Sequence, residues 1–338
     1  MSLNYSLLVR ILNCNISFFH CLRFQDILLW RNINKTTRNA ADLHINSMLD
    51  LSTALRFWFT PLETLLTRGF MQQNGMLLSG PFALNFVRGK STDDILTLHF
   101  YVVDHLHERF HNFLTLIGYE LIGRSLPVVE EPEITCAHDY LRNERCVQVI
   151  RCPISPLITI LGFKHSVMMN FVTSQSVYVL FARGSLRDYK TLVLRDHDSR
   201  LSVALSPHHN AEYLSDNILM DGEHPMSTFS TGLRKVGDGQ TFVWKLHPPL
   251  PCSSPSFIEG NAFLVRSAAF GSWKPHIAYA VIQSRFLKWS YTYPPTSAFS
   301  AIRTMFSDTG AAEELYLELE KNDIRLLEWL HSHLFAII

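Results

Sequence analysis

The sequence has no excess of charge of either sign. Its 338 residues include 30 lysines and arginines and 30 aspartates and glutamates, and charged residues make up only 18% of the chain. A balanced chain lacks the field that attracts nucleic acid or an anionic membrane surface, so we expect neither as a partner. Hydrophobic residues make up 47% of the chain, which provides for a sizeable core and excludes a disordered chain.

Cysteine pairs and long apolar runs are also missing. The six cysteines form no C-x-x-C pair and are irregularly spaced, which favours free thiols in a reducing compartment over a disulfide framework or a zinc knuckle. No window approaches the roughly 18 uninterrupted apolar residues of a membrane span. The apolar first residues are interrupted by Arg10, Asn13 and His20, so we expect no signal peptide. We therefore expect a cytoplasmic or nuclear protein.

The hydrophobic pattern predicts an α+β fold in three parts. Residues 1–50 are predicted to form a small helical module and residues 51–190 an α/β core with a mixed sheet. Residues 191–338 are predicted to form a mixed α+β region that ends in a helix over Ala311–Phe335. Within that last part, the segment Lys235–Gly239 reads as a hairpin turn.

Proline and glycine mark several predicted boundaries. Pro61 is expected at the start of a helix, where its missing N–H is tolerated. Asp104–Gly118 is predicted to be an amphipathic helix with Gly118 as its C-terminal cap. Short strands are expected at about residues 119–123 and 145–150.

The most informative segment is Leu77–Val102. It predicts a buried strand, a Ser-Gly turn, a short apolar helix that begins at Pro81, a polar loop and a second strand. On the second strand, alternation puts Thr97, His99 and Tyr101 on one face of the sheet. The opposite face of this strand is apolar and consists of Leu96, Leu98, Phe100 and Val102.

A metal-assisted phosphoryl or nucleotidyl transfer site has definite needs. Two divalent ions must be held close together, and hard cations prefer carboxylate oxygens on alternate strand residues. Thr97 and His99 have the right spacing, but threonine is neutral and histidine is a poor Mg²⁺ ligand. Asp93 and Asp94 are adjacent and would face opposite ways on a strand, so they can serve only from an irregular loop.

Several short motifs resemble a family of uncharacterised fungal proteins with a nucleotidyltransferase-like fold. The resemblance covers roughly residues 50–290 and is carried by LLSGPFALNFV, TLHFYV, FLTLIGYEL, CVQVIRC, FKHSVMMNFVTSQSVYVLF and LRKVGDGQTFVWKL. Ser79 and Gly80 fit the family's turn, and Ala83, Leu84 and Phe86 fit its helix. The resemblance implies that a catalytic member binds metal through the strand that follows this turn.

The chain departs from this family where the chemistry would lie. The family has a serine where this chain has Pro81, and two strand aspartates where it has Thr97 and His99. Gln148 stands where many transferases place a third carboxylate. Ser79, Gly80, Pro81, Thr97, His99 and Gln148 are therefore predicted to be the positions of a degenerate site, with no catalytic residue, no metal and no cofactor.

The segment LRFQDILLWRNINKTTRNAA is similar to the latter half of an F-box, a helical module that binds a linker subunit of ubiquitin ligases. The residues that carry the resemblance, and that we predict to bind a partner, are Asp26, Ile27, Leu28, Ile33, Asn34 and Arg38. The usual Leu-Pro start is absent, and only Leu7, Leu8, Ile11 and Leu12 could represent the first helix. Either these helices bind such a linker or they pack on the chain's own core.

The segment His107–His111 reads H-E-x-x-H on a predicted helix. Histidines at this spacing lie on one helix face and can bind zinc, with Glu108 polarising a bound water. Against a zinc site stand the charge of Arg109, the missing downstream H-x-x-G-x-x-H extension and the lack of an evident third ligand. We therefore favour the interpretation that His107 and His111 are ordinary residues at the edge of the apolar stripe of this helix.

The sequence predicts a non-catalytic binding or adaptor protein on a degenerate nucleotidyltransferase-like fold. As a ubiquitin-ligase substrate adaptor it would bind a linker subunit through the F-box-like helices and an unknown protein target through the rest. The alternative is an active Mg²⁺-dependent nucleotidyltransferase with unorthodox ligands such as Ser79, Asp93, Asp94 or His99. A zinc hydrolase that uses His107–His111 is a third possibility.

Overall fold

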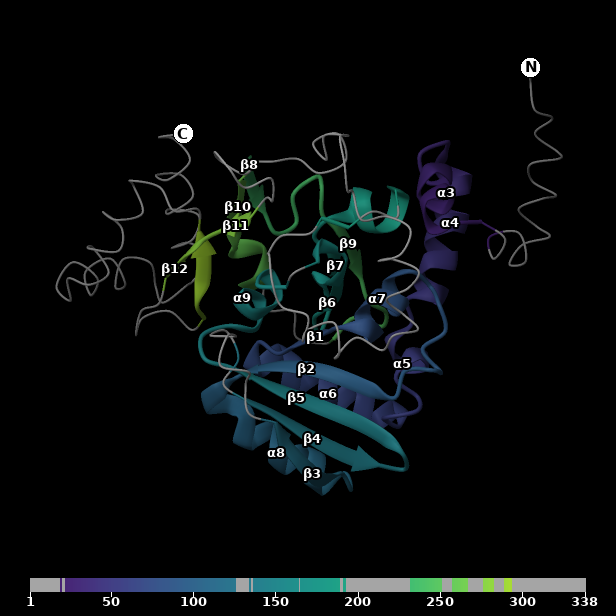
Figure 1. Ribbon diagram of the computed structural model, residues 1–338. Helices are drawn as coiled ribbons and strands as arrows, with labels where there is room; N and C mark the ends of the chain where they lie inside the picture. The colour runs from purple at the N-terminus through teal and green to yellow at the C-terminus, as the bar shows by residue number, and fades with distance from the viewer. Residues whose placement is uncertain are drawn as a thin grey trace, which may run out of the picture.

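The protein is an α+β structure, as predicted, with helices around a large mixed sheet (Figure 1). The computed structural model describes residues 19, 22–125, 134, 136–163, 165–188, 191–192, 232–250, 257–266, 276–282 and 289–293. The predicted helix Ala311–Phe335 and the apolar residues Leu7, Leu8, Ile11 and Leu12 lie outside these ranges. Within them, no helix combines the length and apolar character needed to cross a bilayer.

The described elements alternate between helices and strands along much of the chain. The helices are α3 (Phe24–Trp30), α4 (Lys35–Met48), α5 (Leu51–Ala54), α6 (Pro61–Asn74), α7 (Pro81–Val87), α8 (His107–Leu116) and α9 (Pro156–Leu161). Shorter helical segments are η1 (Asp104–Leu106), η2 (Ser166–Met168), η3 (Arg183–Asp188) and η5 (Phe257–Gly260). The strands are β1 (Leu77–Ser79), β2 (Thr97–Val103), β3 (Glu120–Ser125), β4 (Cys136–Arg142), β5 (Arg145–Cys152), β6 (Asn170–Val172), β7 (Ser176–Val179), β8 (Gly232–Lys235), β9 (Phe242–Lys245), β10 (Ala262–Arg266), β11 (His276–Ala278), β12 (Ala280–Ile282) and β13 (Tyr291–Tyr293).

Local sequence signals account for several of these boundaries. The strand, turn, helix and strand predicted over Leu77–Val102 are confirmed as β1, α7 and β2. Pro61 is the first residue of α6, and Thr60 and Glu63 form a capping box at its start. Gly118 follows the end of α8 with φ +88°, a conformation that glycine adopts without strain.

The main sheet has eight strands in the order β3-β4-β5-β2-β1-β6-β7-β9. Within this sheet β2 and β5 are parallel, and the other neighbours are antiparallel. The chain between β2 and β5 passes through α8 and then through β3 and β4. The last strand, β9, comes from the region that was predicted to be C-terminal to the core.

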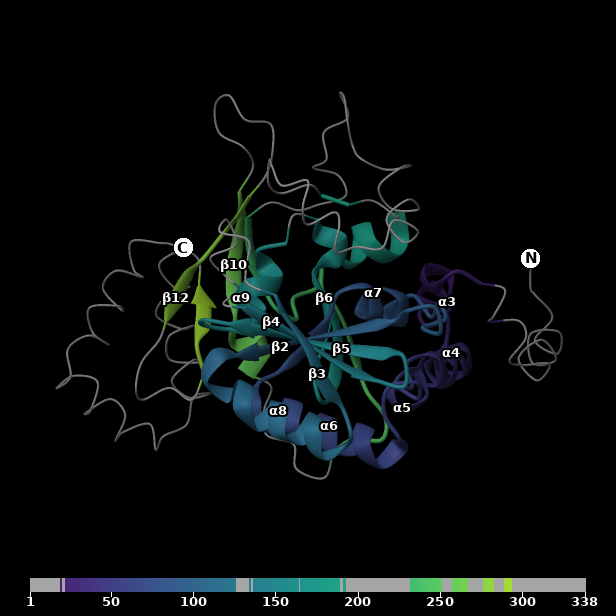
Figure 2. The same ribbon diagram turned by 60° about the horizontal axis from the view of Figure 1, so that its bottom comes forward.

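Alternate residues of β2 enter two hydrophobic cores on opposite faces of the sheet, which confirms the predicted alternation. Leu98, Phe100 and Val102 are fully buried in a core shared with α6 and α8. Tyr101 belongs to the second core, which includes Leu157 of α9. Helices α6 and α8 therefore lie on one side of the sheet and α9 lies on the other (Figure 1). Figure 2 shows α6 and α8 side by side. Between them, the ring centroids of Phe70 and Phe113 lie 4.7 Å apart.

Helices α3 and α4 pack against the β9 edge of the sheet. Trp244 of β9 donates its indole N–H to Asn46 Oδ1 over 2.9 Å, and the rings of Phe24 and Phe242 meet at 5.2 Å. The Arg31 guanidinium also lies 5.0 Å from the Trp244 ring. These contacts fix the N-terminal helix pair to the same core as the sheet.

The predicted hairpin at Lys235–Gly239 is wrong. Strand β8 pairs with β10 in a three-stranded sheet, whereas β9 pairs with β7 in the main sheet. Asp238 accounts for the difference because its carboxylate accepts hydrogen bonds from the Arg234 guanidinium at 2.6 and 3.0 Å and from the Thr241 N–H at 3.1 Å. The turn is therefore held by its own side chains and carries the chain from one sheet to another.

Arg142, the last residue of β4, connects separate elements at the β3–β4 end of the fold. Its guanidinium makes a bidentate pair with Glu63 of α6, each N···O distance being 2.9 Å. It also donates to the carbonyls of Ile117, after α8, and of Trp58. The two side chains are only 19% and 17% exposed, so solvent screens the pair weakly. Hydrogen bonds from Arg142 lower the pKa of the Glu63 carboxyl, which therefore stays ionised at neutral pH.

We expect Arg142→Met to destabilise the fold by about 3 kcal/mol, because it leaves the Glu63 carboxylate and two carbonyls without this partner. Urea unfolding followed by circular dichroism measures the change. Arg38→Met is the matched control, since Arg38 is exposed and donates one hydrogen bond to the Arg31 carbonyl. Equal stabilities of the two variants would contradict the role given to Arg142.

Candidate functional site

The register of the sheet brings four polar side chains into one row. Ser79 on β1 lies opposite His99 on β2, His99 lies opposite Gln148 on β5, and Gln148 lies opposite Asp139 on β4. Residues paired across neighbouring strands project from the same face of a sheet. We call these four residues the polar row. Thr97 lies on the same face, two residues before His99 and opposite Cys146 of β5.

The Ser79-Gly80 turn is filled by the protein itself. Gly80 has φ +81°, and a Cβ at this position would lie 2.6 Å from His99 Nδ1, so the imidazole packs directly against the turn. Ser79 is fully buried, and its hydroxyl donates to the Asn170 carbonyl over 2.6 Å. Pro81, the first residue of α7, has no N–H to donate. The Ser79 hydroxyl is therefore engaged, and Pro81 offers no N–H to a phosphate at this turn.

His99 is neutral in the folded protein. Burial lowers the pKa of its imidazole to about 4, and attraction to Asp139 opposes this effect only in part. Gln148 donates its side-chain N–H to Asp139 Oδ1 over 2.8 Å. The polar row thus consists of a hydroxyl, a neutral imidazole, an amide and one carboxylate that accepts a hydrogen bond.

Asp139 is not among the residues predicted from the sequence, because strand β4 was not predicted. Asn143 was a sequence signal for a turn at the end of this strand, and the structure adds an alternating burial pattern. The buried residues Cys136, His138 and Tyr140 alternate with less buried neighbours, as on a strand with one covered face. Asn143 and Glu144 have positive φ and form the tight turn into β5, and asparagine is typical of such turns.

Asp93, proposed above as an unorthodox ligand, has a different setting. Its carboxylate pairs with Arg56 over 3.2 Å, in the loop between α7 and β2. Asp94 follows in the same loop and is exposed. In the part of the chain that the structure describes, no group of three histidine, cysteine, aspartate or glutamate side chains is arranged to hold a metal ion.

The histidines of the H-E-x-x-H segment converge on a tyrosine. His107 Nε2 lies 3.3 Å and His111 Nδ1 lies 3.0 Å from the hydroxyl of Tyr140 on β4. Burial raises the pKa of Tyr140 to about 12, so its phenol is neutral and can donate to one imidazole while it accepts from the other. The Glu108 side chain is 80% exposed. The segment thus supplies hydrogen bonds between α8 and the sheet.

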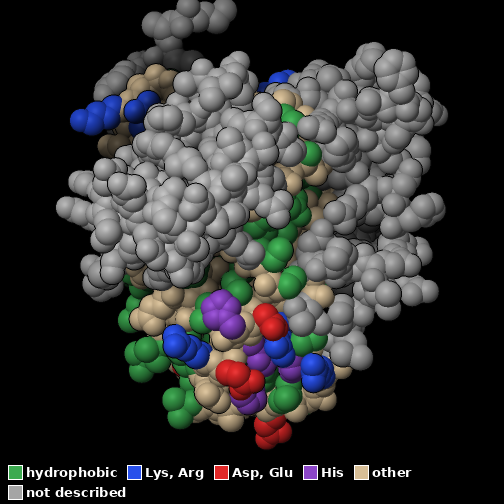
Figure 3. Space-filling view, turned by 90° about the vertical axis from the view of Figure 1, so that its left-hand side faces the viewer, with side chains coloured by type: hydrophobic (Ala, Val, Ile, Leu, Met, Phe, Trp, Pro, Cys, Tyr) green, Lys and Arg blue, Asp and Glu red, His purple; other side chains and the backbone are tan. Residues whose placement is uncertain are grey.

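His138 of β4 extends this group, because its ring lies 4.3 Å from that of His107. We call His107, His111, His138 and Tyr140 the histidine cluster. Histidine side chains also gather beside acidic and basic ones on the lower part of the face in Figure 3. His107 is 4% exposed, and its Nδ1 atom makes no hydrogen bond. Burial, together with repulsion from His138 and Arg151, lowers the pKa of His107 to about 4.

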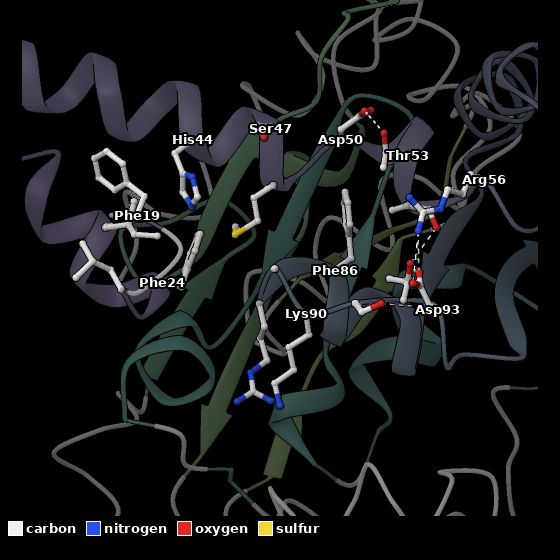
Figure 4. A pocket seen from close by; sticks show the side chains of 18 residues that line it. Phe19, Phe24, His44, Ser47, Asp50, Thr53, Arg56, Phe86, Lys90 and Asp93 are labelled. Atoms are coloured by element: carbon white, nitrogen blue, oxygen red, sulfur yellow. Dashed lines mark hydrogen bonds and ion pairs between the residues drawn. The ribbon is translucent and has the colours of Figure 1, made fainter. Parts of the chain in front are cut away.

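A cavity of about 400 Å³ lies between α3, α4 and α5 and the loop that follows α7. In Figure 4, Phe19, Phe24 and His44 lie on one side of it and Asp50, Thr53, Arg56 and Asp93 on the other. Gly89, with φ +64°, forms part of its wall, and a Cβ there would lie 2.2 Å from the Met48 sulfur. The cavity has the size of a small-ligand pocket and a mixed apolar and charged lining.

The residues predicted to bind a partner lie on α3, on α4 and in the turn between them, and they fall into three groups. Ile27 is 2% exposed and Leu28 packs partly against the same core, so both contact the chain itself. Asn34 caps α4 by accepting a hydrogen bond from the Thr37 N–H over 2.9 Å. The remaining three residues lie toward solvent to different degrees: Ile33 is 60% exposed, Arg38 is exposed and Asp26 pairs with Arg23.

We expect the protein to lose stability as the pH falls from about 6.5 toward 4. The pKa of His107 is about 4 when folded and near 6.5 when unfolded, so the unfolded chain binds more protons in this interval. A difference of this size corresponds to about 3 kcal/mol, and the lowered pKa of His99 acts in the same direction. In His107→Gln, an amide that does not titrate replaces the imidazole near Tyr140. The unfolding free energy of this variant, measured in urea, should therefore depend less steeply on pH in this interval. An unchanged pH dependence would contradict the assignment.

No family model, no curated protein and no solved structure matches this chain. The resemblance to the fungal family and to the F-box therefore stays a prediction from the motifs. A function has to be proposed from the polar row, the histidine cluster, the cavity and the exposed surfaces.

Proposed function

We propose that the protein is a non-catalytic binding protein, an adaptor built on a degenerate nucleotidyltransferase-like scaffold. One observation carries the proposal: the register of β1, β2 and β5 places Ser79, His99 and Gln148 in one row, and none of these three residues has a carboxylate. The His99 imidazole also packs on the Gly80 turn. The position where a transferase would hold metal and phosphate is occupied by the protein's own uncharged groups.

The chemistry of the polar row supports this proposal. Two-metal transfer requires several carboxylate oxygens that converge on a pair of ions. Asp139 is the one carboxylate of the row, and it accepts a hydrogen bond from Gln148. His99, with a pKa of about 4, contributes a neutral imidazole, which is a poor ligand for Mg²⁺.

Exposed apolar side chains on α3, on α4 and in the turn between them support partner binding. Leu29 is 65%, Ile33 60% and Leu43 71% exposed, and we call these three residues the N-terminal apolar surface. The inner side of the same helix pair is fixed to the core through Phe24, Ile27 and other buried residues. A partner would therefore meet a helix pair that is already ordered, which lowers the entropic cost of binding.

The F-box-like motif suggests the identity of this partner. Ile33 and Arg38 belong to both the motif and the exposed side of the helix pair. We therefore propose a ubiquitin-ligase linker subunit as the partner of the N-terminal apolar surface. The target protein would bind elsewhere on the chain.

We expect the full chain to bind a purified linker subunit, and Leu29→Glu with Ile33→Glu to weaken this binding by about tenfold or more, because charges would replace apolar contacts. Calorimetric titration measures the affinity. The matched control is Leu116→Glu, since Leu116 is 84% exposed but lies on α8. No binding by the wild-type chain, or equal binding by the double variant, would refute the adaptor proposal.

An active nucleotidyltransferase with unorthodox ligands remains the second candidate. The observation in its favour is Asp139, a carboxylate on the same row as Ser79 and His99. A single carboxylate supplies fewer oxygen ligands than hard cations usually take from proteins. The non-catalytic proposal therefore fits the polar row better.

A further inference from the structure

The cavity between α3, α4, α5 and the loop after α7 is bounded by segments that are tied to one another. The Thr92 hydroxyl of the loop donates to the Ala54 carbonyl of α5 over 3.0 Å. Asp93 of the same loop pairs with Arg56, just after α5, over 3.2 Å. The loop is therefore fixed to the end of α5, and the volume of about 400 Å³ lies in the lower part of the range of small-ligand pockets.

Aromatic side chains supply much of the apolar part of the cavity lining. Phe19, Phe24 and Phe86 line the cavity and belong to the main hydrophobic core. Phe19 also stacks on His44 of α4, with ring centroids 5.3 Å apart. In Figure 4, Phe19, Phe24 and His44 lie together on one side of the cavity. The core sets the positions of these rings before a ligand binds, which lowers the entropic cost of binding an apolar group beside them.

The charged part of the lining has an excess of cations. Arg56, Arg88 and Lys90 line the cavity together with two carboxylates, those of Asp50 and Asp93. Asp93 is paired with Arg56, and Asp50 caps α5 by accepting hydrogen bonds from a backbone N–H over 3.0 Å and from a threonine hydroxyl over 2.6 Å. Both carboxylates are therefore engaged within the protein, and three cations against two carboxylates favour a ligand group with one negative charge.

The backbone of the loop is already used to end α7. The segment Gly89–Thr92 reads G-K-S-T, the letters that end a phosphate-binding loop. Here, however, the N–H groups of Arg88 and Lys90 both donate to the Asn85 carbonyl, over 3.2 and 3.0 Å, and the glycine N–H donates to the Phe86 carbonyl over 3.1 Å. These three N–H groups cannot cradle a phosphate, so an anionic group in the cavity would meet the cationic side chains instead.

We propose that this cavity binds a small organic monocarboxylate with an aromatic or short alkyl body. The body would lie against the aromatic part of the lining, and the carboxylate would lie near Arg88 and Lys90. In Figure 4, Lys90 lies between the aromatic side and the Arg56–Asp93 pair. A carboxylate matches the single excess cation better than a phosphate ester, which carries about two negative charges. The residues of the N-terminal apolar surface do not line the cavity, so the proposal is independent of the adaptor function.

Ligand-observed NMR titration of the full chain with phenylbutyrate, phenylbutanol and phenylbutyl phosphate tests the proposal. The three probes share an aromatic body and differ in the charge of the end group. We expect phenylbutyrate to bind about tenfold or more tightly than phenylbutanol, because charge-assisted hydrogen bonds form only with the carboxylate. Undetectable binding of phenylbutyrate, equal binding of the alcohol or tighter binding of the phosphate would overturn the proposal.

A change of one cation tests the place of the carboxylate. Lys90→Met removes the charge and keeps much of the side-chain length, so it should weaken phenylbutyrate binding by about fivefold or more and leave phenylbutanol binding unchanged. The matched control is Lys35→Met, since Lys35 is exposed at the start of α4 and does not line the cavity. Equal affinities of the two variants for phenylbutyrate would contradict the proposed site.

A change of volume tests whether the probes enter the cavity. Ser47 of α4 lines the cavity and is exposed, so Ser47→Phe would fill part of the volume without replacing a core residue. This variant should bind both phenylbutyrate and phenylbutanol more weakly than wild type does, because both need the space. Circular dichroism shows whether each variant is folded. A folded Ser47→Phe variant with wild-type affinity for phenylbutyrate would overturn the proposal.

Discussion

The pairing of β2 with an antiparallel β1 and a parallel β5 is the constraint on which the rest of the structure depends. It fixes which side chains of the strand reach each core, because a shift by one residue would exchange Phe100 and Tyr101 between the two faces. The same register brings Ser79, His99 and Gln148 into one row. Fold and candidate site are therefore set by the same hydrogen-bonded ladder, and the residues of the row decide what chemistry the fold can support.

Much of the local structure could be predicted from the sequence, because it depends on near neighbours. The alternation of β2, Pro61 at the start of α6 and Gly118 after α8 follow from rules that act over a few residues. Features set by distant contacts could not be predicted. The orientation of α6 depends on Arg142 and Ser174, and the turn at Asp238 joins two sheets instead of two paired strands. Asp139 reaches the polar row only through the pairing of β4 with β5.

The polar groups of the polar row and the histidine cluster are largely committed to the protein's own structure. His107 and His111 bind Tyr140, Gln148 binds Asp139, and Ser79 binds the Asn170 carbonyl. Some apolar side chains are exposed instead: leucines on α3, α4 and α6, and Ile33 in the turn between α3 and α4. This distribution suits a protein that works through binding, because exposed apolar side chains on ordered helices gain most when a partner covers them.

The most direct test of a non-catalytic scaffold is a calorimetric titration of the wild-type chain with ATP, in the presence and absence of Mg²⁺. A polar row with one carboxylate and a neutral His99 predicts no binding that depends on Mg²⁺. Stoichiometric, Mg²⁺-dependent binding of ATP that is lost in Asp139→Asn would contradict the non-catalytic proposal and would favour an active transferase.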